Sequence, residues 1–198
     1  MAKRPPQPLD RDKLLNVALR ALGARAHSSG ELREKLRRRA QNNEDVDAVL
    51  AKLKEAGYLN DQRFAETYAA TRLEDQGLGK MRVLRDLRQR RVAPKLAEQI
   101  TEQAYAGTDE ASLIEEFLAR KYRGKQLGAF LSEEKNLAAA FRRLRYAGFS
   151  AGQSIRVLKR FASQPEVLDA LEAQDVQESE AAAASSADED RNEHPRDD

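Results

Sequence analysis

Apolar residues recur every three or four positions along most of the chain, which is the spacing of one face of an α-helix. No stretch keeps the strict alternation of apolar and polar residues that a half-buried strand requires. The pattern predicts an all-α fold in which short polar or glycine-containing connections separate the helices. The expected helical ranges are 11–25, 29–40, 44–56, 61–75, 79–91, 94–105, 109–123, 132–147 and 151–162, with a further turn at 165–171.

The helical pattern repeats with a period of about 50 residues, which is typical of a repeat architecture. A shift of 51 positions places Ala18 on Ala69 and also places Leu36 on Leu87, although these pairs belong to different helices. A third copy follows at a shift of 49 positions, which becomes 57 after extra residues near 123–132. We therefore expect three tandem three-helix repeats, similar to helix-turn-helix units, that form an elongated curved solenoid.

Both ends of the chain differ from the repeats in composition. The N-terminus is basic and proline-rich, and residues 172–198 carry ten acidic residues and two arginines. Segments of this kind bury too little apolar surface to fold alone. The predicted organisation is a disordered N-terminus at 1–10, repeats at 11–58, 59–106 and 107–162, and a short helical turn with a disordered acidic tail at 163–198.

The acidic tail conceals a strongly basic body. The 198 residues have a net charge of +2 at pH 7, so the charge of −8 on residues 172–198 leaves +10 on residues 1–171. A basic body favours a polyanion, or a partner with an acidic surface, as ligand. We also expect the tail to compete with DNA for the basic faces.

The residue types in the chain argue against most enzymatic chemistry. No cysteine is present, which excludes disulfides, thiolate metal sites and cysteine nucleophiles. His27 and His194 are isolated, and the segment 77–80 lacks the serine or threonine of a phosphate-binding loop. We therefore expect a non-enzymatic protein without cofactor or metal. No apolar run reaches the ~20 residues of a membrane span, and we expect a cytoplasmic protein.

One corner between two helices is the most distinctive part of the sequence. Gly57 is expected just past a helix end in the left-handed conformation, with Tyr58 packing back on that helix in a Schellman cap. Asn60 suits the N-cap of the next helix, and Leu59 and Phe64 have the spacing of a hydrophobic staple. The aromatic residues could stack on single-stranded bases, but their spacing favours core packing. The predicted structural corner consists of Gly57, Tyr58, Leu59, Asn60, Phe64 and Tyr68.

The second helix of each predicted repeat is rich in arginine and lysine. One interpretation is a surface for the DNA backbone or for acidic residues of a partner, because arginine binds phosphate or carboxylate in a fork. The other is a solvated helix face with local pairs such as Glu31–Lys35 and Glu34–Arg38. The recurrence of the charge at equivalent positions favours the first. The candidate residues for partner or DNA binding are Arg33, Lys35, Arg37, Arg38, Arg39, Lys80, Arg82, Arg85, Arg88, Arg90, Arg91, Arg142, Arg143 and Arg145.

Two segments, 28–36 and 57–68, resemble the signature sequences of the RecX family, the bacterial regulators of RecA. The resemblance covers about residues 10–162 and is loosest in the third repeat, and the acidic tail lies outside it. Family members typically have Asp where this chain has Asn60, and either residue caps a helix.

The resemblance implies a non-enzymatic modulator that binds the RecA–DNA filament and usually inhibits its ATPase, strand-exchange and coprotease activities. Such a protein regulates recombination, DNA repair and the SOS response. The implied partners are RecA, its filament and, through the phosphate backbone and without sequence preference, DNA, and we expect a monomer. The alternative is a stand-alone DNA-binding protein that reads duplex DNA with a helix-turn-helix unit.

Overall fold

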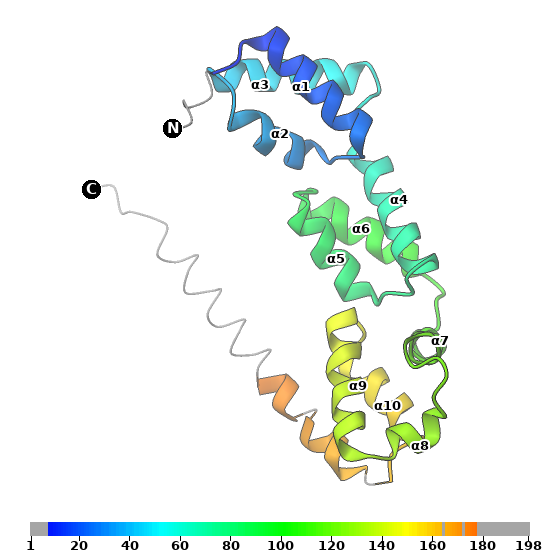
Figure 1. Cartoon of the computed structure of the whole chain (residues 1–198). Helices are drawn as coiled ribbons and strands as arrows, with labels where there is room; N and C mark the ends of the chain where they lie inside the picture. Colours follow the sequence, from blue (N-terminus) through cyan, green and yellow to red (C-terminus); the bar gives the residue numbers. More distant parts are fainter. Residues whose placement is uncertain (1–7, 164, 172, 178–198) are drawn as a thin grey trace, which may run out of the picture. The chain divides into compact units, whose positions relative to one another are not determined.

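The computed structural model describes residues 8–163, 165–171 and 173–177, which are drawn in colour in Figure 1. Helices form the regular structure of these residues, apart from an isolated bridge between Leu9 and Ala40. The prediction of an all-α fold is therefore confirmed. The chain divides into two compact units, residues 1–107 and 108–198, and each unit is described by itself.

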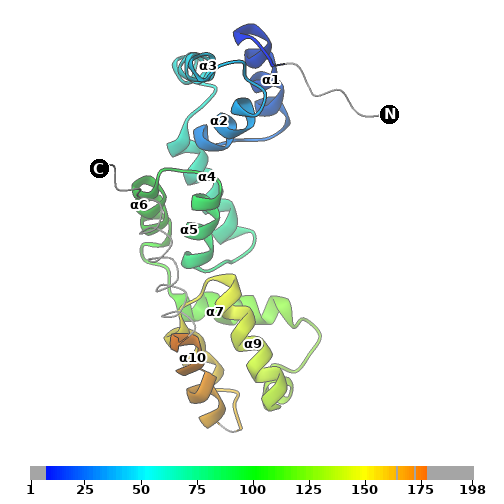
Figure 2. The ribbon, with the colours of Figure 1, turned by 90° about the vertical axis from the view of Figure 1, so that its left-hand side faces the viewer.

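The first unit contains two groups of three helices. In each group every helix contacts the other two, and Figure 2 shows the groups as separate sets. The first group consists of α1 (Arg11–Ala24), α2 (Ser29–Arg37) and α3 (Asn43–Glu55). The second consists of α4 (Asp61–Glu74), α5 (Lys80–Gln89) and α6 (Pro94–Tyr105).

The second unit repeats the three-helix arrangement with one added element. Its helices are α7 (Glu110–Lys121), α8 (Leu127–Leu131), α9 (Glu134–Ala147) and α10 (Ala151–Leu158). Helix α10 packs on α7 and α9, whereas the short α8 packs on α9. Helix α8 lies in the extra residues of the third repeat, for which the sequence predicts no helix. Helical turns then continue at 166–171 and 173–177.

Positions that the sequence predicts to be equivalent in the three repeats are buried in the structure. Three sets of positions related by the predicted shifts are at most 2% exposed in all three copies. The matched sets are Ala18, Ala69 and Leu118; Leu36, Leu87 and Leu144; and Val49, Ile100 and Val157. Each copy thus places an equivalent side chain between its three helices, which confirms three tandem three-helix repeats. The exact limits 11–58, 59–106 and 107–162 stay a prediction.

The corner between α3 and α4 has the predicted backbone geometry. Gly57 has a φ of +73°, a left-handed conformation that favours glycine. The N–H of Tyr58 donates to the carbonyl of Leu53 at 3.0 Å, as in a Schellman cap. The side chain of Asn60 accepts from the N–H of Arg63 at 2.9 Å and caps α4. The entry into α4 is therefore fixed by local hydrogen bonds.

Two side-chain predictions at this corner are wrong. Tyr58 is 63% exposed, and its neighbour Leu59, at 3%, takes the buried position instead. Leu59 belongs to the core of the first repeat and Phe64 to that of the second, so they do not form one staple. Phe64 is buried and Tyr68 packs against the second core, as expected for core residues.

The ends of the described chain are more ordered than the sequence predicts. The N–H of Leu9 donates to the carbonyl of Arg39 at 2.7 Å, and Asp10 caps α1. Disorder is therefore a wrong prediction for residues 8–10, while residues 1–7 lie outside the described part. The pairing with Leu9 also explains why the second helix ends at Arg37 rather than at residue 40. In the tail, residues 173–177 are helical, and residues 178–198 lie outside the described part.

Candidate functional site

The N-terminus of α2 joins the two repeats of the first unit. Ser28 and Glu31 form the predicted capping box, in which the Ser28 hydroxyl accepts from the Glu31 N–H at 3.0 Å. The same hydroxyl donates to the carbonyl of Arg90 at the end of α5. The N–H of Ser29 donates to the Asp61 carboxylate in α4 at 2.6 Å. Helix α2 is thus bonded to both α4 and α5.

Gly30 lets α2 approach the end of α5 closely. A Cβ at Gly30 would lie 2.5 Å from the Cβ of Arg91 and also against its carbonyl oxygen. Arg91 itself has a φ of +57°, a left-handed conformation that is uncommon outside glycine. The junction therefore depends on the absence of a side chain at Gly30.

Glu31 is the acidic centre of this junction. Its carboxylate accepts from Arg25 at 3.2 Å and pairs with Arg90 at 3.3 Å. Burial raises the pKa of Glu31, but the hydrogen bond and charge of Arg25 and the charge of Arg90 outweigh it, so the pKa lies below its ordinary value. Arg90 also lies over the ring of Tyr68, 4.8 Å from its centroid. Arg90 therefore has a structural role inside the protein.

His27 is a buried histidine beside this cluster. Burial, followed by the charge of Arg25, lowers the pKa of His27 below 6.5, although Glu31 opposes the shift. Lys35 and Arg90 are the other charged groups that act on it. A neutral imidazole, with its Nδ1 3.6 Å from Glu31, is therefore the form that the folded protein favours at neutral pH.

Acidification should destabilise the protein partly through His27. The unfolded chain takes up a proton near pH 6.5 more readily than the folded one, so stability falls as the pH falls through that value. We expect the urea midpoint to fall between pH 7.5 and 5.5 by more in the wild type than in His27→Gln. Equal pH dependence in the two proteins would show that His27 is not the responsible group.

Most of the predicted basic residues on α5, and Arg91 just after it, have acidic partners. Each ion pair between exposed side chains contributes little to the stability of the protein. The pairs are Lys80 with Glu102, Arg82 with Asp86 at 2.9 Å, Arg88 with Glu98 at 2.6 Å, and Arg91 with Glu34 at 3.9 Å. Arg85 is exposed on the same helix.

Fewer of the predicted basic residues at the end of α2 have acidic partners. Arg33 pairs with Asp47, and Arg38 pairs with Glu34 at 3.2 Å, as the solvated-face interpretation predicts. Lys35, Arg37 and Arg39 are exposed and form no ion pair with any residue that the structure describes. The predicted Glu31–Lys35 pair is replaced by the pairs of Glu31 with Arg25 and Arg90. These three cations are therefore available to an anion.

A basic groove of about 510 Å³ brings several predicted residues together. Its cationic walls are formed by Arg25, Lys35, Arg38, Arg39 and Arg91, beside Glu31 and Glu34. Arg25 was missed by the sequence analysis, since it follows α1 rather than lying on an arginine-rich helix. Five cations around two carboxylates give the groove an excess of positive charge. We call it the basic α2 groove.

In the second unit, the predicted basic residues of α9 have different partners. Arg145 donates to both carboxylate oxygens of Asp175 at 2.9 Å, so an acid from the segment 172–198 covers a candidate arginine. Arg143 donates to the Tyr122 hydroxyl at 3.3 Å. Arg142 is exposed, without an ion pair in the described part of the chain. Of this helix, Arg142 is thus the residue best placed to bind a ligand.

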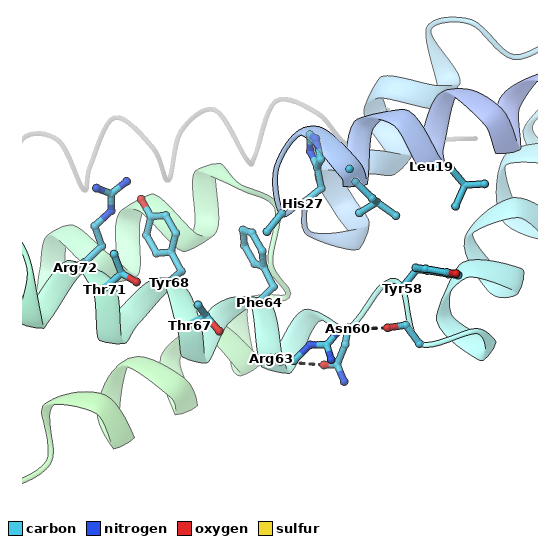
Figure 3. Close-up of a pocket in the computed structure, with 14 residues that line it drawn as sticks. Leu19, His27, Tyr58, Asn60, Arg63, Phe64, Thr67, Tyr68, Thr71 and Arg72 are labelled. Carbon is cyan, nitrogen blue, oxygen red and sulfur yellow. Dashed lines mark hydrogen bonds between the residues drawn. The ribbon is translucent and has the colours of Figure 1, made fainter.

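An apolar groove of about 700 Å³ lies between α1 and α4 (Figure 3). Leu19 of α1 and Tyr58 line it and are 39% and 63% exposed. Among the described residues that line it, the basic ones are His27, Arg63 and Arg72, and none is an Asp or Glu. We call it the junction groove. The sequence analysis missed it, because it depends on two helices whose hydrophobic patterns are read separately.

The described residues were compared with the requirements of a metal-ligand cluster and of a membrane-spanning helix. They contain no group of three or more His, Asp or Glu residues arranged to hold a metal ion. None of their helices combines the length and the apolar character needed to cross a membrane.

Comparisons with known proteins give the same family for different parts of the chain. Family models described as the first and second three-helix domains of RecX match residues 15–53 and 60–100. The regulatory protein RecX of Halorhodospira halophila is 36% identical over 141 residues, which cover 70% of this chain and 81% of that protein. The regulatory protein RecX of Amycolatopsis mediterranei is 32% identical over 149 residues, covering 74% and 82%.

A solved structure is similar in fold. The crystal structure of RecX from Lactobacillus salivarius matches with a TM-score of 0.54 and 20% identity, over 77% of this chain and 96% of that chain. At this identity, the match shows a shared arrangement of helices.

Proposed function

Because this chain belongs to the RecX family of regulatory proteins, we propose that it modulates the RecA recombinase by binding the RecA–DNA filament in the cytoplasm. The observation that carries the proposal is the 36% identity over 141 residues with a regulatory protein RecX. The direction we propose is inhibition of RecA-dependent ATP hydrolysis, strand exchange and coprotease activity. Through it the protein would regulate recombination, DNA repair and the SOS response.

The basic α2 groove supports the filament as ligand. Lys35 and Arg39 line it without ion pairs among the described residues, and Arg37 is exposed on the same helix. Guanidinium and ammonium groups of this kind bind phosphates by charge and by hydrogen bonds, without reading base sequence. Contacts in several repeats would act together, because each bound repeat raises the effective concentration of the next.

Several titratable groups with shifted pKa values cap helices or bond to the backbone. The carboxyls of Asp10 and Asp109 have lowered pKa values because they accept hydrogen bonds, from Lys13 and Ser112 respectively, at the starts of α1 and α7. Burial raises the pKa of Tyr105, whose hydroxyl donates to the carbonyl of Leu78 at 2.6 Å. Each of these shifts belongs to a group with a structural role rather than to an acid–base pair.

Co-sedimentation with RecA filaments tests the proposal. We expect the protein to sediment with RecA on single-stranded DNA and to lower the rate of RecA-dependent ATP hydrolysis as its concentration rises. The control is the same protein with DNA alone, which separates filament binding from DNA binding. Selective binding to one duplex sequence, with no effect on RecA, would instead support a stand-alone helix-turn-helix protein.

A further inference from the structure

We propose that the junction groove is a docking site for a segment of the RecA protein that carries apolar side chains beside carboxylates. This inference rests on the proposed function. In this proposal the junction groove contacts the RecA protein, and the basic α2 groove contacts the phosphates of DNA.

The groove exposes large apolar side chains that are not buried in the core. Leu19 and Tyr58 are among the few large apolar residues of the described chain that are exposed, and both line the groove. Figure 3 shows both side chains in the right-hand part of the view. Exposed apolar side chains gathered in one hollow mark sites of protein interaction. Tyrosine is also among the residues that most often anchor such interfaces.

The charges of the groove indicate an acidic occupant. Its basic lining residues are two arginines and a histidine, and no carboxylate of the described chain lines it. Arg63 donates to the carbonyl of Gly57 at 3.2 Å, so its position is fixed. The Nε of Arg72 is buried and has no hydrogen-bond acceptor among the described residues. A carboxylate on the occupant would pair with the guanidinium groups of Arg63 and Arg72, which line the groove, by charge-assisted hydrogen bonds.

Gly23 leaves one wall of the groove open. It lies in the last turn of α1, where glycine is destabilising relative to alanine. Unlike Gly57, it does not have the positive φ that requires glycine. A Cβ at Gly23 would meet no atom within 4 Å. The open space at Gly23 leaves room for the backbone of the docked segment to approach α1 closely.

Single-stranded nucleic acid fits the groove less well. A stacking platform needs successive ring faces, but Phe64 is only 9% exposed. The ring of Tyr68 is already covered by Arg72 and Arg90, whose guanidinium carbons lie 4.7 and 4.8 Å from its centroid. Tyr58 is then the aromatic residue of the groove that offers a free face. One ring supports an anchor in a protein interface rather than a run of stacked bases.

Binding to DNA-free RecA protein tests the proposal. The double variant Leu19→Ser/Tyr58→Ser should bind immobilised RecA about tenfold more weakly, with its affinity for single-stranded DNA unchanged. Both side chains are exposed, so the fold should be retained. Gly23→Leu should fill the groove and weaken RecA binding to a similar extent, while raising the thermal midpoint because leucine favours the helix. The matched control is Met81→Ser, an exposed apolar residue of α5 outside the groove.

Each other outcome has a defined meaning. If the wild type binds neither RecA nor its filament, the proposed function and this inference both fail. If the wild type binds RecA and the groove variants bind it equally well, the inference alone fails. A loss of DNA affinity in the groove variants would assign the groove to nucleic acid. A change in oligomeric state would assign it to a second copy of this chain, and either result overturns the proposal.

Discussion

Replacing Gly30 with alanine should lower the free energy of unfolding by about 2–3 kcal/mol. The added Cβ would lie 2.5 Å from the Cβ of Arg91 and against its carbonyl oxygen. These atoms are close to the backbone, so they cannot move aside as the end of a long side chain can. Helix α2 must therefore move away from α5, which strains the bonds of Ser28 to Arg90 and of Ser29 to Asp61. Urea unfolding followed by circular dichroism measures the effect.

Gly23→Ala is the matched control for this experiment. It makes the same chemical change in α1, where the new Cβ meets nothing within 4 Å. Alanine is the better helix former, so we expect equal stability or a gain of up to about 1 kcal/mol. If both variants unfolded at the wild-type urea concentration, α2 and α5 would not be in the close contact described above.

The architecture was predictable because it depends on periodicity. Ala18, Ala69 and Leu118 occupy equivalent buried positions, and their spacing is visible in a single sequence. Elements without a repeating pattern were not predictable. Helix α8 is a single short helix within an insertion. The second helix ends early because Arg39 and Gln41 bond to Leu9, a residue that lies outside the helical pattern.

The roles of the charged residues were much less predictable than the core. Arg90 belongs to the same arginine-rich segment as the arginines of α5. It nevertheless pairs with Glu31, which is 59 positions away. Such a pair depends on how one repeat packs on the next, and helical periodicity contains no information about that. The candidate arginines could thus be found as a group, but their partners could not be assigned.

The burial of Tyr58 could not be predicted from the turn motif in which it lies. The Schellman pattern places a hydrophobic residue just after Gly57, and both Tyr58 and Leu59 have N–H groups that bond to the Leu53 carbonyl. In the structure Leu59 points inward and Tyr58 is exposed. The sequence motif therefore fixes the turn of the backbone without fixing which of two adjacent side chains is buried.

Replacing Lys35, Arg37 and Arg39 together with alanine should weaken binding to single-stranded DNA by about tenfold or more at low salt. These exposed cations form no ion pair with the described residues, so no acid in that part of the chain competes with phosphate for them. Three lost phosphate contacts should also reduce the slope of log K against log salt by about 2, at roughly 0.7 per contact. Fluorescence anisotropy at several salt concentrations measures both quantities, and thermal unfolding confirms that the variant is folded.

The triple variant Arg82→Ala/Arg85→Ala/Arg88→Ala is the charge-matched comparison. It also removes three positive charges, but from α5, where Arg82 pairs with Asp86 and Arg88 with Glu98. A phosphate would have to displace those carboxylates, so we expect a smaller loss of affinity and a smaller change in slope. Inhibition of RecA-dependent ATP hydrolysis should weaken in the same order. Equal losses would mean that DNA responds to net charge alone, and a larger loss from α5 would move the phosphate contact to that helix.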